Sequence, residues 1–279
     1  MHTTTIDGAT LGWTDTGAGE PTLLVHAGVF GAWFEPLAGL LGGRVIRMLR
    51  AGYTGGAAVR EPIELAGHAA HAAALLDRLG TGPATVVSHS SGCAIALQLA
   101  LDRPDLVARL VLSEPPLIDE LLDPADQAEV RSTVGAALGG AMAAAARGDI
   151  PTAFDAFNSV VCGHDYRAVL IDVLGEDGLA RAERDAEFFF TNEVPAIGRW
   201  TPPDPARITT PVRLVRGADS PGATHRLIAR LAAVLPDASV TTIAGANHLL
   251  PLTHPAELAG AISSSSVAAA GSPSHAGTG

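Results

Sequence analysis

A serine lies at an abrupt junction between an apolar run and a helical run. Ser90 is the centre of the pentapeptide SHSSG (88–92), which directly follows the strand-like run 84–87. A sharp strand-to-helix turn strains its central residue and presents that side chain above the sheet edge. Small residues two positions away, here Ser88 and Gly92, relieve the crowding. We therefore predict that Ser90 is a nucleophile, although serine-rich turns also join strands to helices without any chemistry.

Two backbone amides are candidates to bind the negative charge that a nucleophilic attack creates. The amide of Ser91 begins the following helix, and the N-terminus of a helix favours negative charge. The amide of Gly28 follows the apolar run 21–26, where a second oxyanion donor must approach from a neighbouring strand. His26 is better suited to order this loop by hydrogen bonding than to act as a base.

A histidine near the C-terminus has the context that a general base requires. His248 follows the last strand-like run, 239–243, after a glycine-containing loop. His254 competes for this role, but it lies further from the strand end and directly before a proline. His68 and His71 lie three residues apart on a predicted helix without a carboxylate in a metal-binding frame, so we interpret them as helix-surface residues and predict no metal site.

Two carboxylates that follow strand ends are candidates to orient this histidine. Asp219 comes four residues after the run 211–215, and Glu114 comes two residues after the run 108–112. Both satisfy the chain order serine, acid, histidine. We prefer Asp219 because of its strand position and keep Glu114 as the alternative acid, and either carboxylate could instead be structural.

Short apolar runs alternate with helical segments along most of the chain. Two alternating stretches, 3–6 and 10–14, are joined by an Asp-Gly pair that favours a hairpin. The runs typical of buried strands are 21–26, 44–49, 84–87, 108–112, 211–215 and 239–243. The clearest helices are 64–79, 92–101, 223–235 and 255–262. This pattern predicts an α/β fold with an open, mostly parallel, eight-stranded sheet covered by helices on both faces.

The alternation stops between residues 117 and 207. Alanine-rich helical stretches replace the strands there, at 127–146, 150–161 and 179–190. We predict an inserted helical cap (117–207) on a core formed by residues 1–116 and 208–263. The serine- and glycine-rich tail (264–279) is predicted to be disordered.

Aromatic residues are concentrated in the predicted cap, which holds seven of the twelve in the chain. Each ring could simply serve the cap's own core, but together they suggest an apolar roof over a binding site. The residues predicted to line this substrate pocket are Phe30, Trp33, Phe34, Phe189 and Trp200.

Composition excludes several classes of function. The net charge of −11 and the absence of a basic cluster argue against a nucleic-acid partner. All 18 basic residues are arginine, which excludes lysine Schiff-base chemistry. Cys93 and Cys162 are too few and too far apart for a disulfide framework or a zinc site. Without a membrane span or a secretory signal, we expect a cytoplasmic protein that binds a small molecule and uses no cofactor, with a homodimer as one option for its oligomeric state.

Together these segments resemble the α/β-hydrolase fold family over about residues 3–262. The motifs that carry the resemblance are the loop at 26–28, the pentapeptide at 88–92, Gly217-Ala218-Asp219 and the stretch 245–248. The chain departs from the family where glycine is more frequent, at Ala27, Ser88 and Asn247. The family's usual acid lies at the position of Ser220, which keeps Glu114 under consideration.

The resemblance implies a hydrolase. Cap-bearing members of the family include esterases, enol-lactonases, carbon-carbon bond hydrolases, haloalkane dehalogenases and cofactor-free haloperoxidases, and the segments 50–53 and 113–116 look like those of bacterial members. A serine rather than an aspartate at position 90 argues against dehalogenase chemistry. We predict cleavage of an ester, lactone or activated carbonyl of a small apolar or aromatic substrate through an acyl-enzyme. The alternatives are carbon-carbon bond cleavage, a non-hydrolytic step of secondary metabolism on the same scaffold, and a ligand-binding member without catalysis.

Overall fold

Eight strands form one sheet in the computed structural model, which describes residues 1–53, 59, 62–116, 121–202 and 204–264. The strands are β1 (His2–Ile6), β2 (Ala9–Gly17), β3 (Pro21–Val25), β4 (Arg44–Leu49), β5 (Ala84–His89), β6 (Val107–Ser113), β7 (Val212–Gly217) and β8 (Ala238–Ile243). Their order in the sheet is β1-β2-β4-β3-β5-β6-β7-β8. The β1–β2 and β2–β4 pairs are antiparallel and the remaining pairs are parallel. The predicted mostly parallel, eight-stranded sheet is confirmed.

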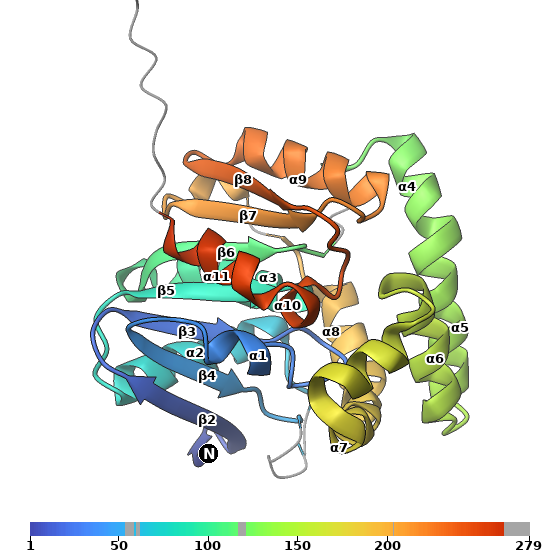
Figure 1. The fold of residues 1–279 in the computed structure, drawn as a ribbon, viewed down its shortest axis with the longest axis horizontal. Helices are drawn as coiled ribbons and strands as arrows, with labels where there is room; N and C mark the ends of the chain where they lie inside the picture. The colour runs from blue at the N-terminus through green and yellow to red at the C-terminus, as the bar shows by residue number, and fades with distance from the viewer. Residues whose placement is uncertain (54–58, 60–61, 117–120, 203, 265–279) are drawn as a thin grey trace, which may run out of the picture.

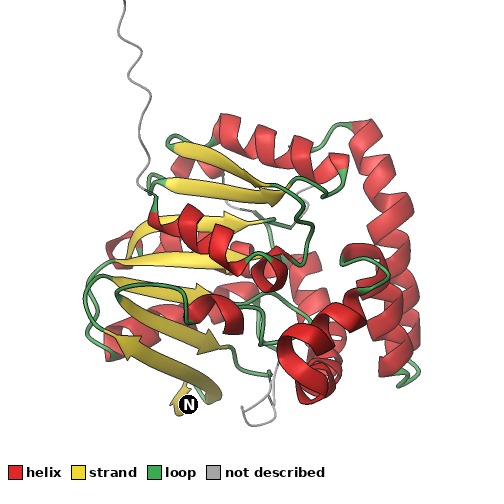
Figure 2. Cartoon of the chain, viewed as in Figure 1, coloured by secondary structure: helices red, strands yellow, loops and turns green. Residues whose placement is uncertain are grey.

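Helices cover both faces of this sheet (Figures 1 and 2). One face packs against α2 (Leu65–Arg78), α3 (Ser91–Asp102) and α9 (Gly222–Val234), and the other packs against α1 (Glu35–Ala38), α10 (Leu250–Thr253) and α11 (Pro255–Ser263). Successive strand residues point to opposite faces. In β3, Leu23 and Val25 join the α2–α3 side of the core, and Leu24 joins the α10–α11 side. Because both faces are buried, the strands are continuous apolar runs instead of alternating ones.

The residues between β6 and β7 that the structure describes form helices and no strand. These helices are α4 (Pro124–Val130), α5 (Ala136–Ala145), α6 (Ile150–Val161), α7 (Tyr166–Phe188) and α8 (Val194–Arg199), with π-helical turns at Arg131–Gly135 and Phe189–Glu193. We call residues 124–199 the α4–α8 segment. Figure 1 shows it beyond the end of the sheet toward which β5 to β8 point.

The α4–α8 segment contains helices that the sequence did not reveal. The first half of α7 and all of α8 went unpredicted, because glycines and acidic residues interrupt the apolar period there. Gly175 has a positive φ of 72° and bends α7. The predicted disordered tail lies almost wholly outside the described residues, which end at Ser264.

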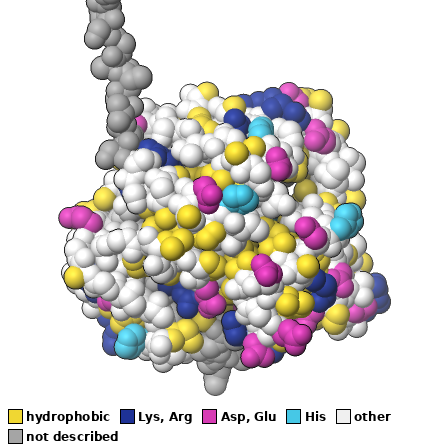
Figure 3. Space-filling model, viewed as in Figure 1, with side chains coloured by type: hydrophobic (Ala, Val, Ile, Leu, Met, Phe, Trp, Pro, Cys, Tyr) yellow, Lys and Arg dark blue, Asp and Glu magenta, His cyan; other side chains and the backbone are white. Residues whose placement is uncertain are grey.

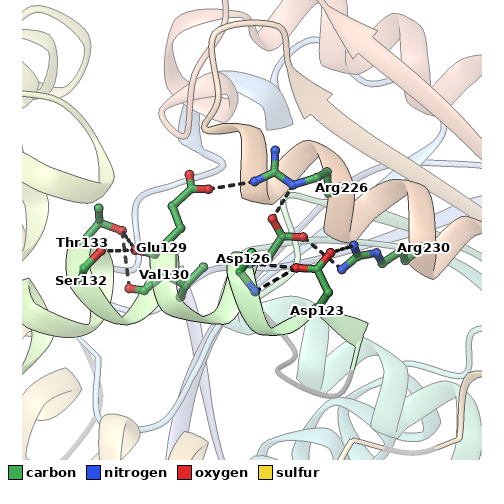
Figure 4. A network of polar contacts seen from close by, with 9 residues as sticks. Asp123, Asp126, Glu129, Val130, Ser132, Thr133, Arg226 and Arg230 are labelled. Carbon is green, nitrogen blue, oxygen red and sulfur yellow. Dashed lines mark hydrogen bonds and ion pairs between the residues drawn. The ribbon is translucent and has the colours of Figure 1, made fainter.

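Ion pairs join α4 to the core helix α9 (Figure 4). The Arg226 guanidinium contacts Glu129 at 2.8 Å, and Arg230 contacts Asp123 at 2.7 Å and Asp126 at 3.1 Å. Asp123 also caps α4 by accepting a hydrogen bond from the amide of Asp126 at 2.9 Å. The beginning of the α4–α8 segment is therefore held against the core by complementary charges.

Charges are scattered over the face that carries α10 and α11. Figure 3 shows hydrophobic side chains along the middle of this face, with acidic and basic side chains around them and no large cluster of one sign. Among the residues described, no helix is both long and apolar enough to cross a membrane.

Candidate active site

Ser90 occupies a strained turn between β5 and α3. Its φ of 48° and ψ of −127° lie in a region that residues other than glycine rarely adopt. The Ser90 amide donates to the carbonyl of Ser113 at 2.9 Å, which fixes the turn to the adjacent strand. At Gly92, a Cβ atom would lie 2.7 Å from the carbonyl oxygens of both Val25 and His26, so only glycine lets α3 approach β3 this closely. The geometry is that of a nucleophile elbow.

His248 is hydrogen-bonded to Glu114. The distance from His248 Nδ1 to Glu114 Oε2 is 2.8 Å, and the side chains are 15% and 2% exposed. The other oxygen, Oε1, accepts from the amide of Gly217 at 2.9 Å and from the hydroxyl of Ser220. Burial alone would raise the pKa of Glu114, but the hydrogen bonds and the charge of His248 outweigh this effect and lower the pKa to about 2. Glu114 is therefore an anion at neutral pH.

The structure corrects our preference for Asp219 as the partner of this histidine. Asp219 is exposed, and its amide donates to the carbonyl of Ala246 at 2.9 Å. Glu114 directly follows β6, where a positive φ of 46° turns the chain. Ser220, at the position where the family usually has its acid, donates its hydroxyl to Glu114. In this structure the carboxylate that contacts His248 therefore follows β6, and Ser220 after β7 donates to it.

The predicted oxyanion donors, Gly28 and Ser91, lie beside Ser90 and contact each other. The amide of Gly28 donates to the hydroxyl oxygen of Ser91 at 2.7 Å, and that hydroxyl donates to Glu193 Oε1 at 2.7 Å. The backbone amide of Ser91 lies in the first turn of α3, where amides have no acceptor within the helix. The sequence did not suggest a side-chain role for Ser91.

His26 orders the loop at residues 26–28 by hydrogen bonding; because this loop carries the candidate donor Gly28, we call it the oxyanion loop. Its Nε2 accepts from the amide of Arg50 at 3.0 Å, so its proton must lie on Nδ1, 2.7 Å from the carbonyl oxygen of Ala27. Burial, and secondarily the charge of Arg50, lowers the pKa of His26 well below 6.5. The ring is neutral and has no free nitrogen with which to act as a base.

A buried cluster lies behind the oxyanion loop, and no sequence motif indicated it. It consists of Arg50, Tyr53 and Glu193. Arg50 Nη2 lies 3.0 Å from Glu193 Oε2, and both side chains are 0% exposed. The Tyr53 hydroxyl donates to the same oxygen. Burial opposes the charge on Arg50, but Glu193 outweighs it and raises the arginine's pKa. The position of Arg50 at the end of an apolar strand could have indicated this cluster, since a buried charge needs a buried partner of opposite charge.

Ser90 and His248 line one cavity of about 420 Å³ between the sheet edge and the α4–α8 segment. Its wall is mostly apolar, and just over half of the lining residues come from the α4–α8 segment. The wall includes Val134, Leu138, Phe157, Val161, Phe189, Val194 and Ile197. Glu114 and His248 are the titratable groups in this wall other than the thiol of Cys162, and no arginine lines it among the described residues.

Two of the five aromatic residues predicted for the pocket line this cavity. Trp33, held by a 2.8 Å hydrogen bond from its indole to the carbonyl of Gly28, and Phe189 both contact it. The predictions for the other three are wrong. Phe30 stacks behind Trp33 at 4.3 Å, Phe34 is buried beneath the α10–α11 side of the sheet, and Trp200 packs on the core at Gln98. Phe30 and Phe34 follow the oxyanion loop closely in sequence, but this closeness did not determine which way their rings point.

The remaining histidines and cysteines do not form a second centre. His68 and His71 are buried, at 0% and 5% exposure, so their assignment to the helix surface was wrong: the His68 ring packs edge-on against Phe188 of α7, with 6.4 Å between the ring centroids. Both cysteines are free and buried, and burial raises the pKa of the Cys162 thiol. In the described part of the chain, no group of three or more histidine, cysteine and acidic residues is placed to hold a metal ion.

The comparisons with known proteins agree with this fold. Residues 22–261 match the model of the alpha/beta hydrolase family, so the chain belongs to that family and is a hydrolase that acts on a small molecule. A 43-residue stretch is 60% identical to lipase LipV of Mycobacterium tuberculosis, although it covers only 15% of this chain and 16% of that protein.

Solved structures share the whole fold. An esterase from Thermogutta terrifontis superposes with a TM-score of 0.68 at 22% identity, covering 93% of this chain and 94% of its own. The enol-lactonase from Burkholderia xenovorans LB400 gives a TM-score of 0.69 at 16% identity, covering 94% and 98%. At these identities the similarity establishes the fold.

Proposed function

We propose that the protein is a serine hydrolase that cleaves an ester or lactone through an acyl-enzyme. Ser90 attacks the carbonyl carbon, and His248 takes the serine proton and returns it to the leaving oxygen. Glu114 holds the imidazole with its proton on Nδ1 and stabilises the imidazolium. The amides of Ser91 and Gly28 bind the oxyanion. A water molecule activated by His248 then releases the acid.

One observation carries this proposal: the Glu114–His248 hydrogen bond lies in the same cavity as a serine with strained backbone geometry. A buried, ionised carboxylate on Nδ1 leaves Nε2 as the acceptor that a serine hydroxyl needs. Strain of this kind persists where the surrounding structure imposes it, and it occurs most often at functional sites.

The cavity favours a neutral, apolar acyl group of modest size. Its wall offers aliphatic and aromatic side chains, and no arginine among the described residues that would bind a carboxylate or phosphate. We propose further that residues 117–207 act as a cap that covers this cavity, on a core of residues 1–116 and 208–263. The esterase and lactonase named above, and the lipase, suggest the same class of carboxylic ester substrates.

The test combines active-site labelling with turnover. A fluorophosphonate probe should add to Ser90 in the wild type, as located by mass spectrometry of the digested protein, and short p-nitrophenyl esters and small lactones should be hydrolysed. Ser90→Ala should lose labelling and at least about 10³-fold in kcat. The matched control is Ser132→Ala, an exposed serine in the π-helical turn of the α4–α8 segment. Undiminished turnover by Ser90→Ala would contradict the nucleophile, and turnover of vinylogous diketones alone would favour carbon-carbon bond cleavage.

A further inference from the structure

A carboxylate of the proposed cap is buried against the oxyanion loop. Glu193 ends the π-helical turn between α7 and α8, yet its side chain contacts residues of the core: Arg50 after β4 and Ser91 at the start of α3. A Cβ atom on Gly28 would lie 3.1 Å from Glu193 Oε1 and 2.4 Å from the ring of Phe189. The cap and the oxyanion loop are therefore in direct contact at a glycine that leaves room for both.

The contacts of Glu193 converge on one peptide group. The carbonyl oxygen of Ala27 and the amide of Gly28 belong to the same trans peptide and point in opposite directions. Arg50 Nη2 donates to the Ala27 oxygen at 3.1 Å and to the Glu193 carboxylate at 3.0 and 3.1 Å. Ser91 Oγ accepts from the Gly28 amide and donates to Glu193, both at 2.7 Å. Each end of the peptide is held by a side chain that Glu193 holds.

We propose that Glu193 is a positioning residue that sets the orientation of the Ala27–Gly28 peptide. The Gly28 amide, which donates to Ser91 Oγ, is thereby held where it can share its hydrogen with the substrate oxyanion. This inference rests on the proposed serine-hydrolase function. Glu193 touches no reacting atom and acts through Arg50 and Ser91. Because it belongs to the cap, the donor is correctly aimed only while the cap is seated on the core.

The charge of Glu193 is essential to this arrangement. Arg50, Tyr53 and Ser91 all donate to its two oxygens, which only a carboxylate can accept in full. A glutamine has the same shape but replaces one oxygen by a donor, so at least one of the three hydrogen bonds is lost. If Ser91 then turns away, the amide end of the peptide loses its acceptor. If Arg50 turns away, the Ala27 oxygen keeps only the hydrogen bond from His26 Nδ1.

The experiment compares Glu193→Gln with the wild type in ester hydrolysis and in the rate of fluorophosphonate labelling. We expect kcat and the labelling rate to fall by about 10- to 100-fold, part of the loss seen when an oxyanion donor is removed, with KM changed less than about threefold. The pH at half-maximal activity should not move, because His248 and Glu114 are untouched. Glu187→Gln, the same change at an exposed position of α7, should behave as the wild type.

A purely structural ion pair would give a different result. Glu193→Gln would then melt at a lower temperature while its kcat, KM and labelling rate per folded molecule stayed at wild-type values, and this outcome would overturn the inference. If Glu193→Gln does not fold, Ser91→Ala tests the same chain of contacts, since it keeps the Ser91 amide and the Arg50–Glu193 pair. We expect the same selective loss in kcat, and a kcat at or above the wild-type value would overturn the inference.

The proton chemical shift of the Gly28 amide separates this inference from the proposed function. If the wild type neither labels nor hydrolyses any ester, the proposed function is wrong. The Gly28 amide proton in a ¹⁵N-resolved NMR spectrum still reports on the peptide: Glu193→Gln and Ser91→Ala should both shift it, and Glu187→Gln should not. Because Ser91→Ala removes the acceptor of this amide, it calibrates the size of the shift, and an unchanged Gly28 resonance in Glu193→Gln would overturn the inference without reference to activity.

Discussion

Glu114 is an anion held by hydrogen bonds from three directions. The imidazole of His248, the amide of Gly217 and the hydroxyl of Ser220 all contact its two oxygens. Hydrogen bonding to the charged form is what keeps a buried carboxylate ionised. Asp219, one residue before Ser220, receives none of these contacts and faces solvent. Two acids that follow neighbouring strands therefore have quite different expected effects on activity.

We expect Glu114→Gln to lower kcat by about 10²- to 10⁴-fold with a small change in KM, because a neutral amide neither fixes the imidazole tautomer nor stabilises the imidazolium. Asp219→Asn makes the same chemical change at an exposed position and should retain kcat within about twofold. Steady-state hydrolysis of one ester by both variants checks this. Equal losses, or a larger loss in Asp219→Asn, would contradict the assignment of the acid.

The β5–α3 unit holds Ser90, the proposed nucleophile, in its strained turn only because α3 lies very close to β3. Gly92 forms the contact, with the carbonyl groups of Val25 and His26 at the distance of hard repulsion from any added Cβ. The strain at Ser90 is thus imposed by the packing of a whole helix. Nearly every residue of α3 from Ser91 to Ala100 is buried. Glycines on α5 face no such constraint.

Gly92→Ala should destabilise the protein by about 1–3 kcal/mol, since the backbone must shift to admit the methyl group. The same change at Gly139, an exposed position in α5 with nothing within 4 Å, should instead stabilise it by about 0.5–1 kcal/mol because alanine is the better helix former. Urea unfolding of both variants measures the two free energies. The packing argument fails if Gly92→Ala is as stable as the wild type.

Acidic side chains are spread over the whole molecule. Glu114 differs from the exposed ones because it is deeply buried and its pKa is lowered to about 2. Exposed pairs such as those between α4 and α9 are screened by salt and contribute little to stability each. Titration of the buried carboxylate is therefore the sharper determinant of how stability depends on pH.

Stability should fall as acid protonates Glu114. Its pKa in the folded protein, about 2, lies below its ordinary value of 4.5, so its stabilising effect is complete above pH 4.5 and is lost as the pH falls toward 2. The free energy of unfolding of the wild type should exceed that of Glu114→Gln by on the order of 3 kcal/mol at pH 7. Urea titrations at pH 7, 4 and 3 should show this difference shrinking. A difference independent of pH would contradict the assigned titration.

Most strands of the core could be predicted from the sequence, because the patterns that indicate a strand or a turn involve only residues close together in the chain. Apolar runs located the six parallel strands, β3 to β8, and the SHSSG segment located the strained turn at Ser90, because strand burial and turn strain depend on residues next to one another. Ser90 and His248 were each recognisable from a strand end and the loop after it, and the structure places both at one cavity.

The rest depended on contacts between distant segments. The choice between Asp219 and Glu114 turned on which side chain points along the sheet edge, and a positive φ at Glu114 decided it. The directions of Phe34 and Trp200 follow from how helices pack, which no local pattern encodes. Glu193 contacts Arg50 across 143 positions of sequence.

The buried pair of Glu193 and Arg50 also limits how this enzyme can be recombined with its relatives. If the α4–α8 segment were replaced by the corresponding segment of another family member, a carboxylate would reach this position only where that segment carried one. Without it, Arg50 would be left as an uncompensated charge in the interior. Removing one partner of such a pair costs about 3–5 kcal/mol. In a chimera, the turn at Phe189–Glu193 and the end of β4 must therefore be inherited as one unit.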